Sequence, residues 1–235
     1  MTMSDAELLD ALRRVVTEAR AHLDTGQGVK LLYSDVHSLS SSIWTVGLQP
    51  GGSHAEHDQW CREPGAHDYR DGYRASAVVR PRGLQLRRQL DLMILWLGID
   101  WRDTLSLNLV PFRSARWEKQ PLRWREAALD FARNHFWPLL VTHRQPRLVI
   151  AFSKDVAQVL RSPALFGHRT FRTYPTGWGV YTADISDLDG TTLLRLPHLS
   201  TFKIFTRPEC REPLARIRSD SGLIHALLGV ASPVK

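Results

Sequence analysis

Three short polar motifs each follow an apolar stretch typical of a buried strand, and this pattern constrains the fold more than any other feature of the chain. The motifs and their preceding stretches are Gly47 to Gly52 after 43–46, Asn108 within 105–110, and Pro197 to Ser200 after 191–196. In an open α/β sheet, the carboxyl ends of parallel strands border the crevice in which ligands bind. We therefore expect the three motifs to converge on one site.

Helical and strand patterns alternate along the chain. Apolar spacing predicts helices over 5–24 and 86–97, from Pro121 onward, over 154–161 and after Pro208. It predicts strands at 43–46, 105–110, 147–152, 180–183 and 191–196. Such alternation is typical of an α/β protein, here a three-layer α/β/α sandwich with a mostly parallel central sheet. At 235 residues the chain predicts a single domain, 1–235, with helix 5–24 packed on it.

Two stretches have the composition of surface loops. Residues 51–83 are rich in His, Asp, Arg, Gly and Pro, and residues 162–179 in Gly, Pro, aromatic and basic side chains. Long loops are uncommon unless they have a function. We expect the first to shape the site and the second to be a surface excursion.

Charge and hydropathy limit the partners. Thirty-one Lys and Arg against 24 Asp and Glu give a net charge of +7, which favours a polyanion such as nucleic acid. The longest apolar run, 92–99, is far short of the ~20 residues that cross a bilayer, and the first residues lack a signal-peptide pattern. The sequence therefore predicts a cytoplasmic protein with no membrane partner. Cys61 and Cys210 lack zinc-site spacing, which indicates reduced, non-catalytic thiols.

Each motif has a structural and a functional interpretation. Closely spaced glycines in 47–52 allow either a plain turn or a close backbone approach to a ligand. Asn108 is an amide in an apolar strand, and it either bonds neighbouring backbone or contacts a ligand. His198 stands just past a strand, where an imidazole can donate a hydrogen bond into the crevice. Together, Asn108 and His198 suit the edge of a planar heterocycle such as a nucleobase.

In order and spacing, Gly47-Leu48-Gln49-Pro50-Gly51, Leu107 to Arg113 and Pro197-His198-Leu199-Ser200 resemble the uracil-DNA glycosylase superfamily. In that family a Gly-x-(Asp/Asn)-Pro loop holds the hydrolytic water, a strand-borne Asn recognises the base, and a His-Pro-Ser segment supplies a catalytic His. The resemblance covers about residues 43 to 207. This chain differs in having Gln49 before the proline and in lacking two prolines after His198.

The resemblance implies a role for each matching residue. Gln49 would orient the water and His198 would donate to a base carbonyl, so these two are the candidate catalytic residues, while Asn108 would bind the base edge. Phe202, four positions after His198, would be the wedge inserted into DNA. The remaining candidates for contact with the DNA backbone are Gly51, Gly52, Arg113, Ser200, Lys203 and Arg207. Packing of Phe202 and Phe205 against the last helix is the alternative for the wedge position.

The long loop 51–83 also contains candidate stacking rings and candidate metal ligands. Base stacking needs a ring, and the long loop offers Trp60, Tyr69 and Tyr73, of which Trp60 and Tyr73 are retained as base-binding candidates. The spacing of His54, His57, Asp58, His67 and Asp68 fits no regular ligand set, so a solvated loop is favoured over a metal site.

The sequence thus predicts a glycosylase-like fold that hydrolyses the N-glycosidic bond of uracil or another deaminated base in DNA, without metal or organic cofactor. Two alternatives remain open. One is a non-catalytic module that binds nucleic acid, or an inhibitor-like mimic of a glycosylase partner. The other is a doubly wound protein that binds a free nucleotide through Gly47 to Gly52.

Overall fold

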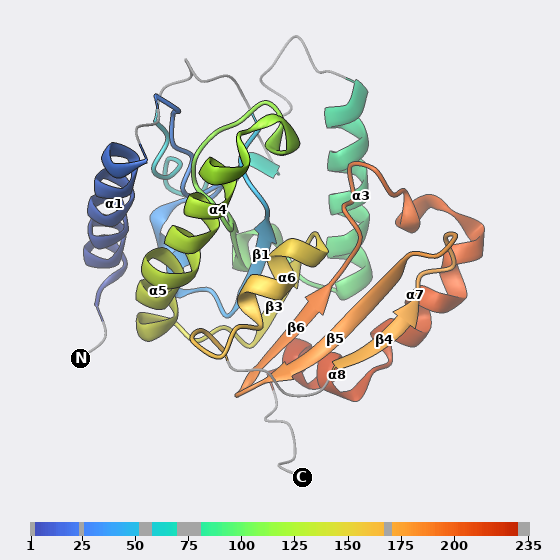
Figure 1. Cartoon of the computed structure of the whole chain (residues 1–235). Helices are drawn as coiled ribbons and strands as arrows, with labels where there is room; N and C mark the ends of the chain where they lie inside the picture. Colours follow the sequence, from blue (N-terminus) through green and yellow to red (C-terminus); the bar gives the residue numbers. More distant parts are fainter. Residues whose placement is uncertain (1–2, 24–25, 52–57, 70–80, 167–170, 230–235) are drawn as a thin grey trace.

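A single six-stranded mixed sheet runs through the molecule in the order β2-β1-β3-β6-β5-β4 (Figure 1). The computed structural model describes residues 3–23, 26–51, 58–69, 81–166 and 171–229. The strands are β1 (Ile43–Gly47), β2 (Thr104–Asn108), β3 (Leu148–Ala151), β4 (Phe171–Pro175), β5 (Thr182–Leu188) and β6 (Thr191–Arg195). The pairings among β2, β1, β3 and β6 are parallel, whereas β5 runs antiparallel to both β6 and β4. The prediction of a mostly parallel sheet is confirmed.

Helices cover both faces of the sheet (Figure 1). The α-helices are α1 (Asp5–His22), α3 (Pro81–Leu97), α4 (Leu122–Phe131), α5 (Trp137–His143), α6 (Lys154–Leu160), α7 (Arg211–Arg218) and α8 (Ser221–Leu228). A π-helical stretch, η5 (Ala132–Phe136), joins α4 to α5. The 3₁₀ turns are η1 (Val36–Ser40), η3 (Trp101–Asp103), η4 (Trp117–Lys119), η6 (Ile204–Thr206) and η7 (Pro208–Cys210).

Side-chain alternation along the strands divides the interior into two cores. Trp44 and Val46 of β1 face the core shared with α1, α4, α5 and α6. Ile43 of the same strand faces the core shared with α3, α7 and α8. Successive side chains of a strand point to opposite faces, so strands buried on both faces are apolar throughout, and this accounts for the continuous apolar runs in the sequence.

Local signals set the helix starts. The Ser4 side chain accepts from the backbone N–H of Glu7, and Glu7 bonds back to the N–H of Ser4, which forms a capping box at α1. Ser153 accepts from the N–H of Val156 at the start of α6, as the sequence predicts. The predicted helices at 5–24, 86–97, after Pro121 and at 154–161 are confirmed with shifted ends.

Two expectations need correction. The stretch 162–179 is not only a surface excursion, because it contains β4, an edge strand whose largely exposed side chains hide the strand pattern. A single last helix is replaced by two, since Asp220 caps a new helix, α8, directly after α7 ends. The strand predicted at 180–183 begins two residues later and extends further, as β5 at 182–188, so residues 180 and 181 precede it.

Residues 29–34 add backbone pairing at the β2 edge of the sheet, which the sequence pattern does not reveal. Leu32 pairs antiparallel with Leu107, and Tyr33 N–H donates to the carbonyl of Ser106 at 2.9 Å. On its other side, Leu31 N–H donates to the carbonyl of Gln59 at 2.9 Å. This segment brings Tyr33 beside the end of β2.

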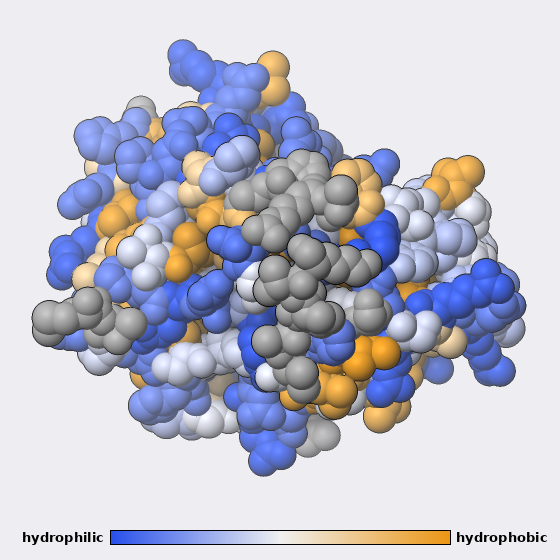
Figure 2. Space-filling view, turned by 90° about the horizontal axis from the view of Figure 1, so that it is seen from below, coloured by the Kyte–Doolittle hydropathy of each residue, from blue (hydrophilic) through white to orange (hydrophobic). Residues whose placement is uncertain are grey.

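Among the described residues, no helix is both long and apolar enough to span a membrane. Figure 2 views the molecule from below, where hydrophilic residues dominate and hydrophobic ones lie in small scattered groups. Both cysteines, Cys61 and Cys210, are free thiols, in agreement with the prediction that neither forms a disulfide.

Replacing Asp220 by alanine is expected to lower the free energy of unfolding by about 2 kcal/mol at pH 7. The carboxylate accepts from Nε of Arg172 at 2.7 Å, from the Tyr174 hydroxyl at 2.5 Å and from the N–H of Gly222 at 2.9 Å. Burial raises the pKa of Asp220, but the bonds from Arg172 and Tyr174 outweigh it, so this pKa lies below its ordinary value. The stabilisation is therefore present above pH 3.8 and lost only as pH falls through the lowered pKa.

Urea unfolding of the wild type and the variant at pH 7, 4 and 2 measures this loss. The exposed Glu212→Ala on α7, which removes a surface pair with Arg216, is the control and should change stability by less than about 0.5 kcal/mol. Equal effects of the two variants, or a difference that has already vanished at pH 4, contradict the prediction.

Candidate functional site

The three sequence motifs lie along one edge of the sheet. Gly47 of β1 is the direct register partner of Asn108 of β2. Beyond the strands, Phe152 N–H donates to the carbonyl of Val46 at 3.0 Å, and Leu196 N–H to that of Ala151 at 2.8 Å. The carboxyl ends of β2, β1, β3 and β6 therefore stay aligned. Strand β2, which carries Asn108, and strand β6, which precedes His198, are three inter-strand spacings apart. This distance is about 14 Å.

Asn108 is buried at the end of β2, with 3% of its surface exposed. Its Nδ2 donates to the hydroxyl of Tyr33 at 2.8 Å. A Cβ atom added at Gly47 would lie 2.3 Å from Oδ1 of Asn108, which is closer than real contacts allow. Gly47 is thus required in β1 because the Asn108 amide occupies the space of a side chain there.

The aromatic ring beside Asn108 is Tyr33, which the sequence analysis missed. Tyr33 stacks on Tyr69 with ring centroids 4.8 Å apart, and Nζ of Lys30 lies 4.0 Å from the Tyr33 centroid. Trp101 also contacts Tyr69, with ring centroids 5.5 Å apart. The sequence feature that could have indicated this segment is the apolar pair Leu31-Leu32 before Tyr33, which is typical of a short strand.

The other aromatic candidates are not brought to Asn108 by any described contact. Trp60 packs against the core that includes α1, and the guanidinium of Arg13 lies 5.3 Å from its ring centroid. Tyr73 and Gly52 lie outside the described residues, as do His54 and His57.

The loop after β1 is attached to the segment after β2 by a ladder of bonds. Leu109 N–H donates to the carbonyl of Gly47 at 2.8 Å, and Ser114 N–H to that of Pro50 at 3.0 Å. Gln49 Nε2 donates to the carbonyl of Ser114 at 3.0 Å. Gln49 Oε1 is buried and has no hydrogen-bond partner within the described ranges. This amide oxygen is an acceptor held in place at the edge of the site.

Arg113 is buried rather than exposed to solvent, with 7% of its surface accessible. Its Nη1 donates to the carbonyl of Gly51 at 3.3 Å. Gly51 itself is exposed, and a Cβ there would meet nothing within 4 Å. Arg113 therefore anchors the loop through the Gly51 carbonyl. Its contact with phosphate remains a prediction.

His198 reaches the surface between two buried neighbours, Pro197 and Leu199. The backbone N–H of Ser200 donates to His198 Nδ1 at 3.3 Å, and the Ser200 hydroxyl lies 2.7 Å from the same atom. A backbone N–H can only donate, so Nδ1 accepts and the ring proton lies on Nε2. Surrounding protein displaces part of the hydration shell, which lowers the pKa of His198. The ring is therefore a neutral imidazole with a donor on Nε2.

Helix α3 supports the loop that follows His198. Gln89 is 1% exposed and accepts from the N–H of Phe205 at 3.0 Å, while its Nε2 donates to the hydroxyl of Thr206 at 3.2 Å. Gln85 donates to the carbonyl of Ser200 at 3.3 Å. These amides fix the path of residues 200–206, which carry the predicted wedge.

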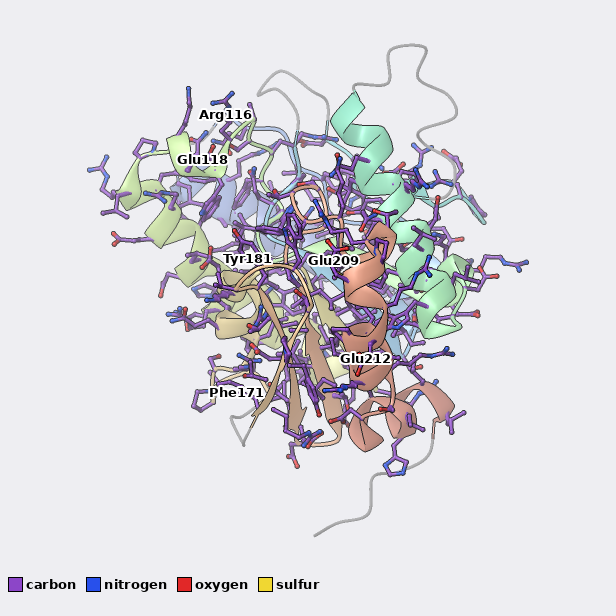
Figure 3. The ribbon with its side chains drawn as sticks, turned by 90° about the vertical axis from the view of Figure 1, so that its right-hand side faces the viewer. Arg116, Glu118, Phe171, Tyr181, Glu209 and Glu212 are labelled. Carbon is purple, nitrogen blue, oxygen red and sulfur yellow. The ribbon has the colours of Figure 1, made fainter. Side chains whose placement is uncertain are left out.

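Phe202 is half-buried and lies against Tyr181, with ring centroids 4.0 Å apart. Tyr181 belongs to the β4–β5 turn, and the register places this turn at the same edge as the end of β6. Figure 3 labels Tyr181 at this end of the hairpin and Phe171 at the other. Val180, next to Tyr181, is 90% exposed. Phe202, Tyr181 and Val180 thus form an apolar projection at the rim, of which the sequence indicated only Phe202.

The two cations after Phe202 differ in their surroundings. Lys203 is exposed, and no ion pair of its side chain occurs within the described residues. The guanidinium of Arg207 lies 3.1 Å from the ring centroid of Trp178, and Arg207 pairs with Glu209 at 3.2 Å. Lys203 is therefore the cation more open to an anionic partner.

Three of the loop residues that the sequence predicts to be solvated contact other parts of the protein. His67 is 3% exposed, with Nε2 3.0 Å from the hydroxyl of Ser106. Asp58 pairs with Arg20 at 2.8 Å, and Asp68 pairs with Lys30 at 2.5 Å. The solvated-loop interpretation is therefore wrong for His67, which is buried, whereas Asp58 is exposed and Asp68 is partly exposed. No group of three His, Cys, Asp or Glu within the described residues could hold a metal.

Neither a scan against protein-family models nor a search of the curated proteins finds a match to this chain.

Proposed function

We propose that this protein is a DNA glycosylase that hydrolyses the N-glycosidic bond of uracil or another deaminated base flipped out of DNA, on a uracil-DNA glycosylase-like fold. The observation that carries the proposal is the neutral His198, whose Nε2 donor stands at the same sheet edge as Asn108 and Gln49.

His198 supplies a donor where charge builds during the reaction. The C1′–N bond breaks with its electron pair moving onto the base, and Nε2–H hydrogen-bonds the base carbonyl that takes up this charge. A donor fixed in advance stabilises such charge by about 3 to 4 kcal/mol. Because Nδ1 accepts from the backbone N–H of Ser200, the ring proton stays on Nε2.

Gln49 supplies the acceptor for water. In the proposed step Oε1, which is covered by protein in this structure, turns toward the attacking water and accepts its hydrogen bond, and the water oxygen bonds to C1′ as the base leaves. An amide takes no proton, so the water proton passes to the departing base. The sugar is positively charged in the transition state, so water can attack it with little help from a general base.

In this proposal the residues at the rim of the site bind DNA. Phe202, supported by Tyr181 and Val180, would enter the base stack, and Lys203 would contact the phosphate chain. The net charge of +7 favours approach to a polyanion.

The test is incubation with end-labelled oligonucleotides that carry uracil, hypoxanthine or xanthine, followed by alkali, which cuts abasic sites. The wild type is expected to yield strand cleavage with at least one lesion, and Gln49→Ala to reduce it. No cleavage of any lesion by a folded protein that binds DNA would overturn the enzymatic proposal.

A non-catalytic nucleic-acid-binding module is the second candidate. The observation that favours it is the Gln49 amide, which is bonded to the Ser114 carbonyl and carries no basic group. This candidate predicts salt-sensitive DNA binding that Lys203→Gln weakens, with no base release in the same assay.

A further inference from the structure

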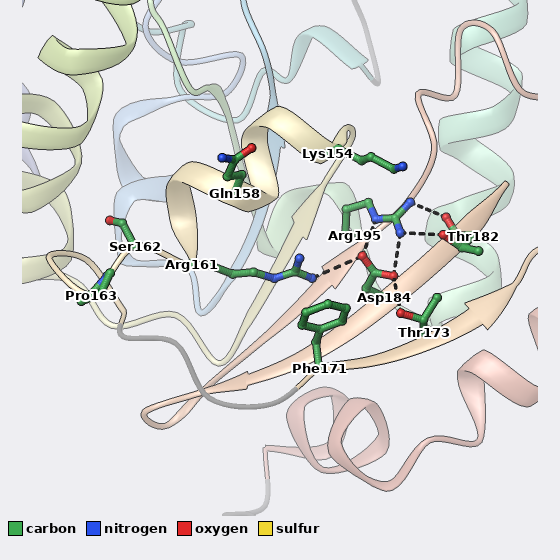
Figure 4. A pocket seen from close by; sticks show the side chains of 10 residues that line it. All are labelled: Lys154, Gln158, Arg161, Ser162, Pro163, Phe171, Thr173, Thr182, Asp184 and Arg195. Atoms are coloured by element: carbon green, nitrogen blue, oxygen red, sulfur yellow. Dashed lines mark hydrogen bonds and ion pairs between the residues drawn. The ribbon is translucent and has the colours of Figure 1, made fainter.

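A cavity of about 680 Å³ lies between α6 and the neighbouring face of strands β4, β5 and β6 (Figure 4). Its lining includes none of Asn108, Gln49 and His198. Its lining comes from α6, the residues just after it and the three strands. This volume lies in the range of small-molecule sites.

A buried ion pair forms the floor. Asp184 and Arg195 are 6% and 4% exposed, and their side chains approach to 2.6 Å. Arg195 also donates to the carbonyl and the hydroxyl of Thr182, and Thr173 donates to Asp184 at 3.1 Å. Asp184 therefore neutralises Arg195.

Two further cations lack a full counter-charge. Arg161, at the end of α6, donates through Nε to Ser186 and lies 3.5 Å from Asp184, which is already paired with Arg195. Lys154, the first residue of α6, is exposed and has no ion pair within the described part of the chain. Three positive groups thus share one carboxylate around the cavity. Burial lowers the pKa of Arg161, and the neighbouring Arg195 acts in the same direction.

A flat apolar surface adjoins the cations. Phe171 of β4 is 47% exposed, and the guanidinium of Arg161 lies 4.6 Å from its ring centroid (Figure 4). The hydroxyl of Ser162 is buried and has no hydrogen-bond partner in the described ranges. An anion flanked by a planar ring matches this combination, because cations and a hydroxyl bind phosphate while an aromatic face accepts a base.

We propose that this cavity binds one nucleotide unit, with its phosphate between Lys154 and Arg161 and its base on Phe171. The unit is either a free nucleoside monophosphate or one residue of a single strand. The site does not depend on the proposed glycosylase activity.

Isothermal titration of the whole chain with dAMP and with the single-stranded pentamer of deoxyadenylate tests the proposal. We expect at least one of them to bind. Lys154→Gln should weaken binding about tenfold and Phe171→Ser at least about fivefold, by loss of a charged contact and of stacking. Arg14→Gln, an exposed cation of α1, removes the same charge elsewhere and should leave binding unchanged. Thermal unfolding verifies that each variant is folded.

The two sources are distinguished by their affinities. A pentamer that binds at least tenfold tighter than dAMP identifies a strand as the ligand, whereas equal affinities identify the free nucleotide. Inorganic phosphate and deoxyadenosine serve as partial ligands, and each should bind more weakly than dAMP.

Three results would overturn the proposal. They are no binding of either probe at millimolar concentration, binding of phosphate as tight as that of dAMP, and binding lost in His198→Ala but retained in Lys154→Gln. Phe171→Ser is also expected to keep full base-excision activity. Failure of the glycosylase assay alone therefore leaves the cavity proposal intact.

Discussion

Replacement of His198 by alanine is expected to lower the rate of base excision by about 10²- to 10³-fold, the usual loss of one preorganised donor. The Nε2 donor of the neutral ring disappears in this variant. The measurement is single-turnover excision from a uracil-containing duplex, with DNA affinity determined in parallel. Affinity should change little, because the lost bond is stronger in the transition state than in the bound substrate.

Ser200→Ala is the matched control for this variant. It removes the hydroxyl at Nδ1 but leaves the backbone N–H that fixes the tautomer, so the rate should fall by less than about tenfold. Because displacement of water by protein lowers the pKa of His198, the loss of the wild-type rate with falling pH should have its midpoint below pH 6.5. Full activity in His198→Ala would contradict the assigned role.

Gly47→Ala is expected to have the second-largest effect. Its Cβ would lie 2.3 Å from Oδ1 of Asn108, so either the β1–β2 pair separates or the amide rotates away. We expect a loss of about 1 to 3 kcal/mol in the free energy of unfolding, as for overpacked sites. Excision should fall as far as in Asn108→Ala, because both changes remove the positioned amide from the site.

Gly51→Ala, four residues further along the same loop, provides the comparison. A Cβ there meets nothing within 4 Å, so the free energy of unfolding should stay close to that of the wild type. The double variant Gly47→Ala with Asn108→Ala should be no slower than Asn108→Ala alone, since the clash partner is absent. Equal effects of Gly47→Ala and Gly51→Ala would contradict the steric explanation.

Local patterns in the sequence predicted much of the fold. The apolar runs at 43–46, 105–110 and 147–152 became β1, β2 and β3, because strands buried on both faces must be apolar throughout. The pattern failed at β4, where an edge strand with exposed side chains resembles a loop. It also failed at residues 29–34, whose pairing depends on β2 and on residues after 58 rather than on their own composition.

For the candidate site, too, the sequence predicted some features and not others. The sequence by itself determined the order of Gly47, Asn108 and His198 at strand ends, since the end of a strand is a local property and parallel ends share one edge. Only the tertiary structure decided which groups meet there. The contact of Tyr33 with Asn108, that of Tyr181 with Phe202, and the cavity between α6 and β4 all join residues distant in sequence. Such contacts depend on strand register and helix packing, which no short stretch of sequence encodes.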